Sequence, residues 1–180
     1  MSQLLLDRPR LTVEISERDH VRGPITARLT LIEYGDYECP FCAAAHPNVK
    51  QVLGELGEQL AFAYRHFPLA TIHPHAFTAA EAAEAAGAQG RFWEMHDLLF
   101  ENQDRLSMDD LLVYAQLLGL DMDRFVADLQ RHTYEPRVRE DFMTGVRSGV
   151  NGTPTFFVNG VRHNGGVDAN SLLEALAASA

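Results

Sequence analysis

The amino-acid sequence predicts an α/β fold with an inserted α-helical domain. Apolar, β-branched runs at 29–34 and 59–67 indicate strands, and the spacing of apolar residues from about 40 to 57 indicates a helix between them. If these two strands are parallel, we expect the helix to connect them by a right-handed crossover. Residues 75–148 carry almost no strand pattern, so a helical block interrupts the sheet in the sequence.

The predicted domain boundaries follow from this change of pattern. The chain has 180 residues, a length that suits one domain with a sizeable insertion. We expect residues 1–70 and 150–180 to form the α/β domain, and residues 71–149 to form the inserted helical domain.

Further strands are predicted near both ends of the chain. Residues 11–15 alternate and are β-branched, which predicts a first strand, and residues 16–27 are typical of a loop. Two short strand patterns at 155–158 and 161–163 flank an Asn-Gly pair at 159–160, a pair that favours a hairpin with a type I′ turn.

Helix ends are marked by capping residues. Ser107 and Asp121 are typical N-cap residues, and Asp110 forms an imperfect capping box with Ser107. Asp168 is expected to cap the last helix, and Pro47 should kink the helix in which it lies. The helices predicted in the insertion cover 75–89, 91–100, a segment after Ser107, 122–132 and 134–145.

Composition excludes several classes of function. The net charge is −10, from 15 basic and 25 acidic residues, and no basic block is present, which argues against nucleic-acid or anionic-membrane partners. No stretch approaches the ~20 apolar residues of a transmembrane helix, so we expect no membrane insertion. The first ten residues lack the apolar run of a secretory signal, and this predicts a cytoplasmic rather than an extracytoplasmic protein.

The two cysteines are the candidate redox centre. Cys39 and Cys42 lie two residues apart, where the strand at 29–34 gives way to a helix, and Pro40 suits the first turn of that helix. Cys39 should therefore face the unpaired N–H groups and positive dipole of the helix N-terminus, which lower a thiol pKa. We expect Cys39 to be the nucleophile and Cys42 to resolve the mixed disulfide.

A second part of the site is expected before the C-terminal hairpin. Thr153 and Pro154 precede a strand pattern that looks buried, and a proline there is compatible with an ordinary trans bond or with a cis bond. Glu33 ends the central strand six residues before Cys39, and the alternation of that strand leaves open whether its carboxylate is solvated or buried.

With these features the chain resembles the DsbA-like branch of the thioredoxin superfamily. The likeness rests on the Cys39–Cys42 motif at a strand–helix junction, the helical insertion, and Gly152-Thr153-Pro154 before a hairpin and a terminal helix. It implies a thioredoxin-like fold and a protein-disulfide oxidoreductase with an exposed nucleophile at Cys39 and a resolving thiol at Cys42. It also implies that Pro154 is cis and lines the substrate groove.

The resemblance assigns further residues to the site. It implies that Glu33 is a buried carboxylate that exchanges a proton with the resolving thiol. Thr153, Pro40 and Phe41 would contact substrate, and Phe67 and Leu69 are further candidates to line the groove. The substrates would be proteins or small thiols, with a separate redox recycling partner. We expect no cofactor, because the cysteine pair itself carries the electrons.

The sequence also departs from the best-known DsbA pattern. The dipeptide between the cysteines is Pro-Phe rather than Pro-His, so it offers no imidazole to the thiolate, and Thr153 stands before the proline, where its hydroxyl could bond near the sulfurs. No secretory signal is seen. The direction of electron flow is therefore left open.

Other interpretations of the same residues remain. A CxxC pair is half of a tetrahedral zinc site, which His73 and His75 could complete, although they lie far along the chain. A thioredoxin-like domain could also be a non-redox chaperone or adaptor. A glutathione-linked transferase or isomerase is a third alternative, against which the second cysteine argues because such chemistry needs one nucleophile.

Overall fold

The computed structural model describes residues 8–179. The expectation about a secretory signal rests largely on residues outside this range. The five strands are β1 (His20–Arg22), β2 (Leu29–Gly35), β3 (Leu60–His66), β4 (Thr155–Val158) and β5 (Val161–Arg162). The helices are α1 (Pro40–Leu56), the short 3₁₀ helix η1 (Gly57–Gln59), α2 (Ala76–Gly87), α3 (Phe92–Glu101), α4 (Met108–Leu117), α5 (Met122–Gln130), α6 (Glu135–Arg147) and α7 (Ala169–Ala178).

The strands form one mixed sheet in the order β1-β3-β2-β4-β5. β2 and β3 are parallel, with Leu31 opposite Phe62, and α1 connects them as the sequence predicts. The other neighbours are antiparallel. Asn159 and Gly160 both have positive φ, 45° and 75°, and join β4 to β5 in the predicted hairpin.

The predicted first strand at 11–15 is wrong. Residues 20–22, predicted as loop, form β1 instead and pair with β3. The backbone of the 11–15 segment bonds outside a ladder, since Leu11 N–H donates to the Gly160 carbonyl (2.9 Å) and Thr12 N–H to the Ser148 hydroxyl (3.0 Å). Its apolar side chains pack against the sheet, and they produced the strand-like alternation.

Helix ends agree with the capping residues. Ser107 and Asp110 form a complete capping box at the start of α4. The carboxylates of Asp121 and Asp168 accept from backbone amides at the starts of α5 and α7. α1, which contains Cys42, runs without interruption through Pro47.

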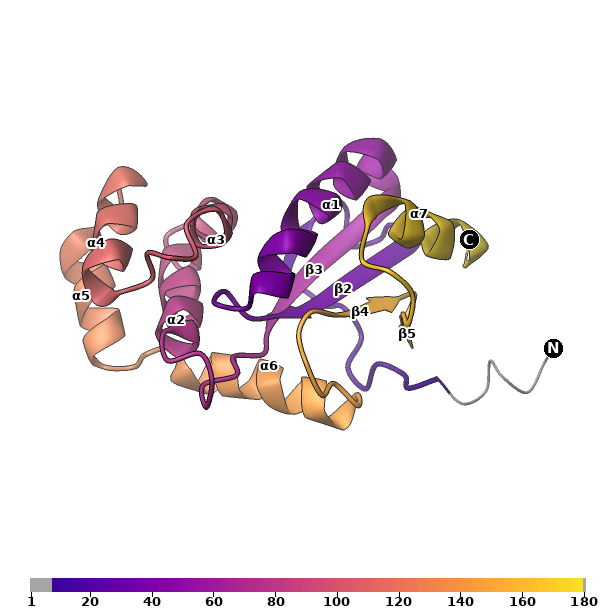
Figure 1. Cartoon of the computed structure of the whole chain (residues 1–180). Coiled ribbons are helices and arrows are strands. Elements are labelled where there is room, and N and C mark those ends of the chain that lie inside the picture. Colours follow the sequence, from indigo (N-terminus) through magenta and orange to yellow (C-terminus); the bar gives the residue numbers. More distant parts are fainter. Residues whose placement is uncertain (1–7, 180) are drawn as a thin grey trace.

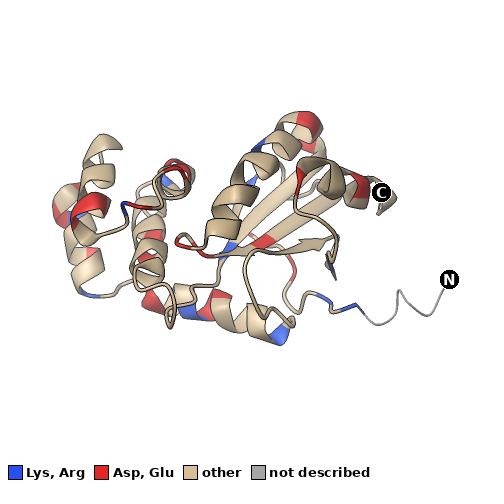
Figure 2. Ribbon diagram, in the orientation of Figure 1, with Lys and Arg blue, Asp and Glu red and all other residues tan. Residues whose placement is uncertain are grey.

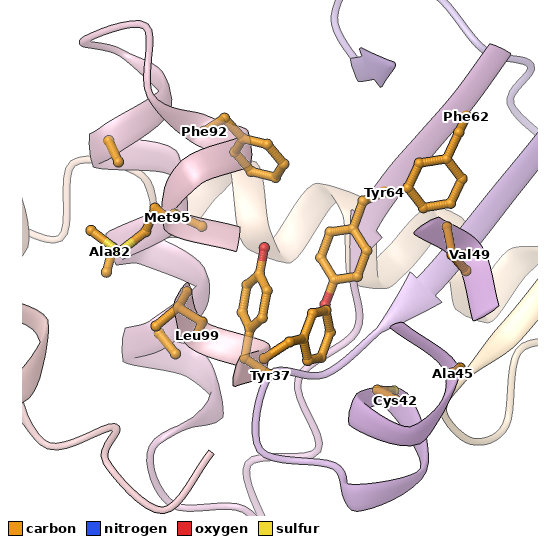
Figure 3. Packing of buried hydrophobic residues seen from close by; sticks show 14 of the residues in the cluster. Tyr37, Cys42, Ala45, Val49, Phe62, Tyr64, Ala82, Phe92, Met95 and Leu99 are labelled. Atoms are coloured by element: carbon orange, nitrogen blue, oxygen red, sulfur yellow. The ribbon is translucent and has the colours of Figure 1, made fainter. Parts of the chain in front are cut away.

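The sheet is covered on both faces (Figure 1). α1 and α7 lie over one face, where Leu31 belongs to a large core cluster, and α6 lies against the other face, where Ile32 and Tyr34 belong to a second cluster. The large cluster continues from the sheet into the insertion, with Met95 and Leu99 of α3 beside Tyr37 and Tyr64 (Figure 3). The insertion therefore shares its core with the α/β part, and the boundaries near 70 and 150 remain a prediction.

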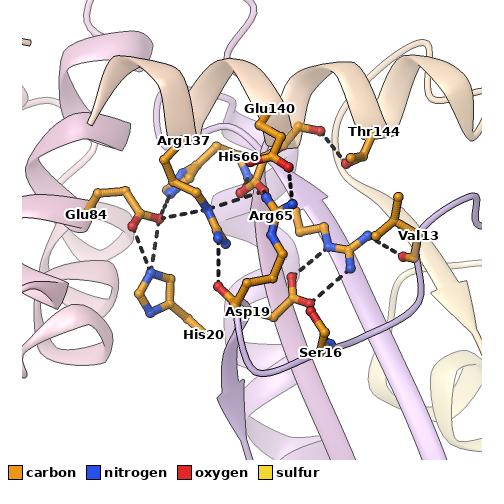
Figure 4. Close-up of polar contacts among 12 residues, drawn as sticks. Val13, Ser16, Asp19, His20, Arg65, His66, Glu84, Arg137, Glu140 and Thr144 are labelled. Carbon is orange, nitrogen blue, oxygen red and sulfur yellow. Dashed lines mark hydrogen bonds and ion pairs between the residues drawn. The ribbon is translucent and has the colours of Figure 1, made fainter. Parts of the chain in front are cut away.

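A buried polar cluster joins the sheet to the insertion (Figure 4). Glu84 of α2 accepts from the imidazoles of His66 on β3 (2.8 Å) and His20 on β1 (3.0 Å). Asp141 of α6 accepts from the backbone N–H of His66 (3.2 Å), and Arg137 lies 3.5 Å from Asp141 and 3.9 Å from Glu84. Four elements thus meet around one carboxylate.

Charged residues are interspersed over the molecule. Acidic and basic residues occur together on α1, α5 and α6, the helices α2, α3, α4 and α7 carry acidic residues without Lys or Arg, and none of these helices is wholly basic (Figure 2). Within residues 8–179, none of the helices combines the length and the apolar character that crossing a bilayer requires.

Candidate active site

The loop between β2 and α1 sets the position of the first cysteine. Asp36 is buried, and its carboxylate accepts from the backbone N–H of Glu38 (2.8 Å) and of Leu69 (2.8 Å) and contacts the His73 imidazole (2.8 Å). These bonds fix the turn that leads into the helix. Cys39 is the N-cap residue of α1, as the sequence predicts.

Cys39 has the character of a thiolate. Its pKa is lowered to about 5, because it is hydrogen-bonded by the Cys42 thiol, by Thr153 and by the backbone amides of Cys42 and Phe41, and these bonds outweigh the effect of burial. The residue is only 3% exposed, so the expectation of an exposed nucleophile is wrong. Its sulfur lies under the Thr153 loop, 3.4 Å from the Thr153 carbonyl oxygen.

Cys42 has the opposite character. It is fully buried one turn into α1, and burial raises its pKa well above the ordinary value. Its hydrogen bond to Cys39 and the negative charge of Glu33 raise the pKa further. Both cysteines are free thiols in this structure. The two sulfurs therefore differ in protonation: Cys39 favours the thiolate, and Cys42 favours the thiol.

The Thr153 loop lies opposite the cysteines. The Thr153–Pro154 peptide bond is cis. The Thr153 carbonyl oxygen can accept only from the thiol form of Cys39, whereas the buried Thr153 hydroxyl is the part of the residue that helps to lower the Cys39 pKa. Thr153 thus lies against the Cys39 sulfur, directly before the cis-proline and strand β4.

Glu33 is buried beneath the active-site helix. Its residue is 2% exposed, and it lies on the same face of β2 as Leu31, the face that α1 covers. Its Oε1 atom has no hydrogen-bond partner among residues 8–179. Burial, and secondarily the negative charge of Cys39, raise its pKa to about 8. Of the two possibilities that the sequence left open, the structure has the buried carboxylate.

The residues expected to contact substrate divide into two groups. Pro40 and Phe41 are exposed, and 68% of Phe41 faces solvent beside Cys39. Phe67 is buried and stacks on Phe142 of α6, so the expectation that it lines a groove is wrong. Leu69 is half-buried and lines an apolar cavity of about 390 Å³ between the linker after β3 and α6.

The zinc ligands suggested by the sequence are not assembled around the cysteines. His73 contacts Asp36, and His75 lies 3.0 Å from the Glu38 carboxylate. Neither cysteine belongs to a group of three metal-ligating side chains within residues 8–179.

Sequence reasoning missed one residue that holds the active-site loop. The side-chain amide of Gln103, which follows α3 in the insertion, donates to the backbone carbonyls of Tyr37 and Cys39, both at 2.8 Å. Gln103 lies 64 positions after Cys39 and in no recognisable motif, so nothing in the sequence pattern marks it.

Comparison with known proteins places the whole site in a family. A family model described as Thioredoxin matches residues 15–178. The chain is 50% identical over 160 residues to the Na(+)/H(+) antiporter NhaA 1 of Salinispora arenicola, covering 89% of this chain and 24% of that protein. It is 48% identical over 164 residues to NhaA 1 of a Mycobacterium species, covering 90% and 27%. This chain thus spans about a quarter of the length of these relatives.

Solved structures give the same fold. A thioredoxin-like oxidoreductase from Silicibacter pomeroyi has a TM-score of 0.81 and 25% identity, covering 91% of this chain and 93% of that one. BdbD from Bacillus subtilis has a TM-score of 0.81 and 21% identity, covering 96% and 95%. The thiol-disulfide exchange protein α-DsbA2 from Wolbachia pipientis has a TM-score of 0.80 and 18% identity, covering 92% and 89%. The chain is therefore a member of the thioredoxin superfamily, and the structures that it resembles are those of DsbA-like thiol–disulfide oxidoreductases.

Proposed function

We propose that this protein exchanges disulfides with protein or small-molecule thiols through Cys39 and Cys42. The observation that supports this best is the opposite shift of the two thiol pKa values, about 5 for Cys39 and well above the ordinary value for Cys42. Near pH 7 the first sulfur is then a thiolate, the form that attacks disulfides, and the second remains a thiol.

The proposed reaction conserves atoms and electrons. The Cys39 thiolate attacks one sulfur of a substrate disulfide, forming a mixed disulfide and releasing one substrate thiolate. Cys42 then loses its proton and attacks the Cys39 sulfur, which forms the Cys39–Cys42 disulfide and releases the second substrate thiolate. The substrate gains two electrons and the protein loses two. In reverse, the same steps oxidise a substrate dithiol.

Glu33 is the proposed acceptor of the Cys42 proton. A carboxylate with a pKa near 8 is a base of suitable strength for a buried thiol, and the negative charge of Glu33 acts on the pKa of Cys42. We assign substrate docking to Phe41, Thr153 and Pro154, because Phe41 is exposed, Thr153 contacts the Cys39 sulfur, and a cis peptide bond joins Pro154 to Thr153.

Two cysteine variants test this proposal. Cys39→Ser should abolish the catalysed reduction of insulin by dithiothreitol, because the attacking sulfur is gone. Cys42→Ser should accumulate mixed disulfides through Cys39, detectable by mass spectrometry, because the resolving thiol is gone. A Cys39→Ser protein that reduces insulin at the native rate would exclude the redox function. Circular dichroism of both variants controls for folding.

The compartment and the recycling partner form a separate part of the proposal. One candidate is that the protein acts on its own in the cytoplasm. The antiporter names of the relatives favour a second candidate, in which this domain serves as a thiol–disulfide module beside a membrane transporter. Fractionation of native cells separates the two: recovery with the membranes supports the transporter arrangement, and recovery in the cytosol supports a free reductase.

A further inference from the structure

Three side chains on α1 and α3 converge next to the active-site helix without taking part in the proposed exchange. One nitrogen each of His46 and His96 and one carboxylate oxygen of Asp97 lie within 4.8 Å of one another. His46 is 6% and His96 is 2% exposed. The His46 Nε2 and Asp97 Oδ1 atoms are buried, lie 3.4 Å apart, and have no hydrogen-bond partner in the described part of the chain.

We propose that His46, His96 and Asp97 bind a transition-metal ion such as Zn²⁺. Two imidazoles and one carboxylate form a three-ligand set that zinc proteins use when the fourth position is open. Ligands about 2.0–2.1 Å from a tetrahedral zinc lie about 3.3–3.4 Å from each other, which matches the observed Nε2–Oδ1 separation. The ion would give both unpartnered atoms a partner and would tie the active-site helix to the insertion.

Neighbouring polar side chains hold His96 and Asp97 in place, as groups that hydrogen-bond to metal ligands do in known metal sites. The Nδ1 atom of His96 is 3.0 Å from the Tyr37 hydroxyl, which leaves Nε2 as its ligand atom. The other oxygen of Asp97, Oδ2, is held by Arg22 (3.0 Å) and Lys50 (3.5 Å), so Oδ1 remains available. Burial lowers the pKa of both imidazoles, and neutral imidazole is the form that binds metal.

A second histidine–carboxylate group within residues 8–179 differs from this one in its carboxylates. His66, Glu84 and Asp141 also lie close together, but Arg137 already lies 3.9 Å from Glu84 and 3.5 Å from Asp141. Each carboxylate oxygen of Glu84 and Asp141 thus already has a hydrogen-bond partner in the chain, whereas Asp97 Oδ1 has none among the described residues. At Asp97 the cations Arg22 and Lys50 contact only the outer oxygen, and two imidazoles favour zinc, copper or nickel over the hard ions calcium and magnesium.

The test must separate this site from the cysteine pair, because thiolates are themselves zinc ligands. We would titrate Co²⁺, and then Zn²⁺ in competition, into a Cys39→Ser, Cys42→Ser double variant of the full chain. One equivalent should bind, with visible d–d absorption and no thiolate charge-transfer band. The oxidised native protein should bind equally, because its cysteines are tied in a disulfide.

Substitutions then assign the ligands. His46→Gln and Asp97→Asn, each in the double variant, should weaken Co²⁺ binding by at least about 100-fold and abolish the Zn²⁺-induced rise in Tm. His75→Gln is the matched control, because it changes another histidine that contacts a carboxylate, one whose imidazole is half exposed. This variant should bind Co²⁺ as tightly as its parent does. The proposal would be overturned if neither the cysteine-free protein nor the oxidised protein bound Co²⁺ or Zn²⁺. It would also be overturned if His46→Gln bound Co²⁺ as tightly as its cysteine-free parent.

Discussion

Glu33 and Glu84 are both buried glutamates, yet their pKa values are shifted in opposite directions. Glu84 accepts hydrogen bonds from His20 and His66, and these outweigh its burial and hold its pKa well below the usual range. Glu33 has an oxygen without a partner among the described residues, and burial raises its pKa to about 8. The same side chain is therefore a fixed anion at one site and a titrating group at the other.

This difference separates structural from chemical roles. A carboxylate surrounded by donors is a permanent negative charge that joins β1, β3 and α2, and it has no proton to exchange near pH 7. A carboxylate without donors beside a buried thiol costs stability when charged, but it can take a proton at the pH where Cys42 must lose one. We therefore assign cohesion to Glu84 and keep Glu33 as the proposed site of proton exchange.

The largest expected effect is on Glu84. Glu84→Gln removes the charge that the surrounding imidazoles and Arg137 face, and breaking a buried pair in this way costs about 3–5 kcal/mol. The free energy of unfolding from urea titration at pH 7 measures it. Glu94→Gln is the control, because its pair with Arg91 is exposed and surface pairs contribute about 0–1 kcal/mol. Equal losses in the two variants would mean that the buried cluster is not structural.

Glu33→Gln should leave the protein folded and remove a pH dependence. The folded pKa of Glu33 lies above its ordinary value of 4.5, so the folded protein binds more protons than the unfolded chain between about 4.5 and about 8. Stability should therefore fall as pH rises through this window, by up to about 1.4 kcal/mol per pH unit. Urea unfolding at several pH values should show this fall in the oxidised native protein and not in oxidised Glu33→Gln.

The oxidised form is needed because the reduced protein mixes two effects. The Cys39 pKa is lowered to about 5 from 9, so the thiolate adds stability that grows with pH above about 5 and opposes the Glu33 effect.

Glu33→Gln should also resolve mixed disulfides more slowly, by at least about tenfold, because Cys42 loses its proton acceptor. A pH dependence that survives Glu33→Gln unchanged would place the titrating group elsewhere.

The sequence predicted the parts of this molecule that local rules determine. Cys39 at a helix N-terminus, the capping box at Ser107 and the Asn-Gly hairpin depend on a few neighbouring residues, and all three are present. The strand expected at 11–15 failed because its alternation reflects packing beneath the sheet, while its backbone bonds to a turn and a helix end. Gln103 could not be found either, because only the tertiary fold brings it to the active-site loop.

The smallest expected effect concerns another buried polar group of the site, the Thr153 hydroxyl. Thr153→Val removes the side-chain hydroxyl, which lowers the Cys39 pKa less than the Cys42 thiol does, so the pKa of Cys39 should rise only slightly. Cys42→Ala should raise it more, because the Cys42 thiol is the largest cause of the lowered value. The ultraviolet absorbance of the Cys39 thiolate, followed against pH, measures both shifts. If Thr153→Val had the larger effect, the hydroxyl rather than the resolving thiol would hold the thiolate.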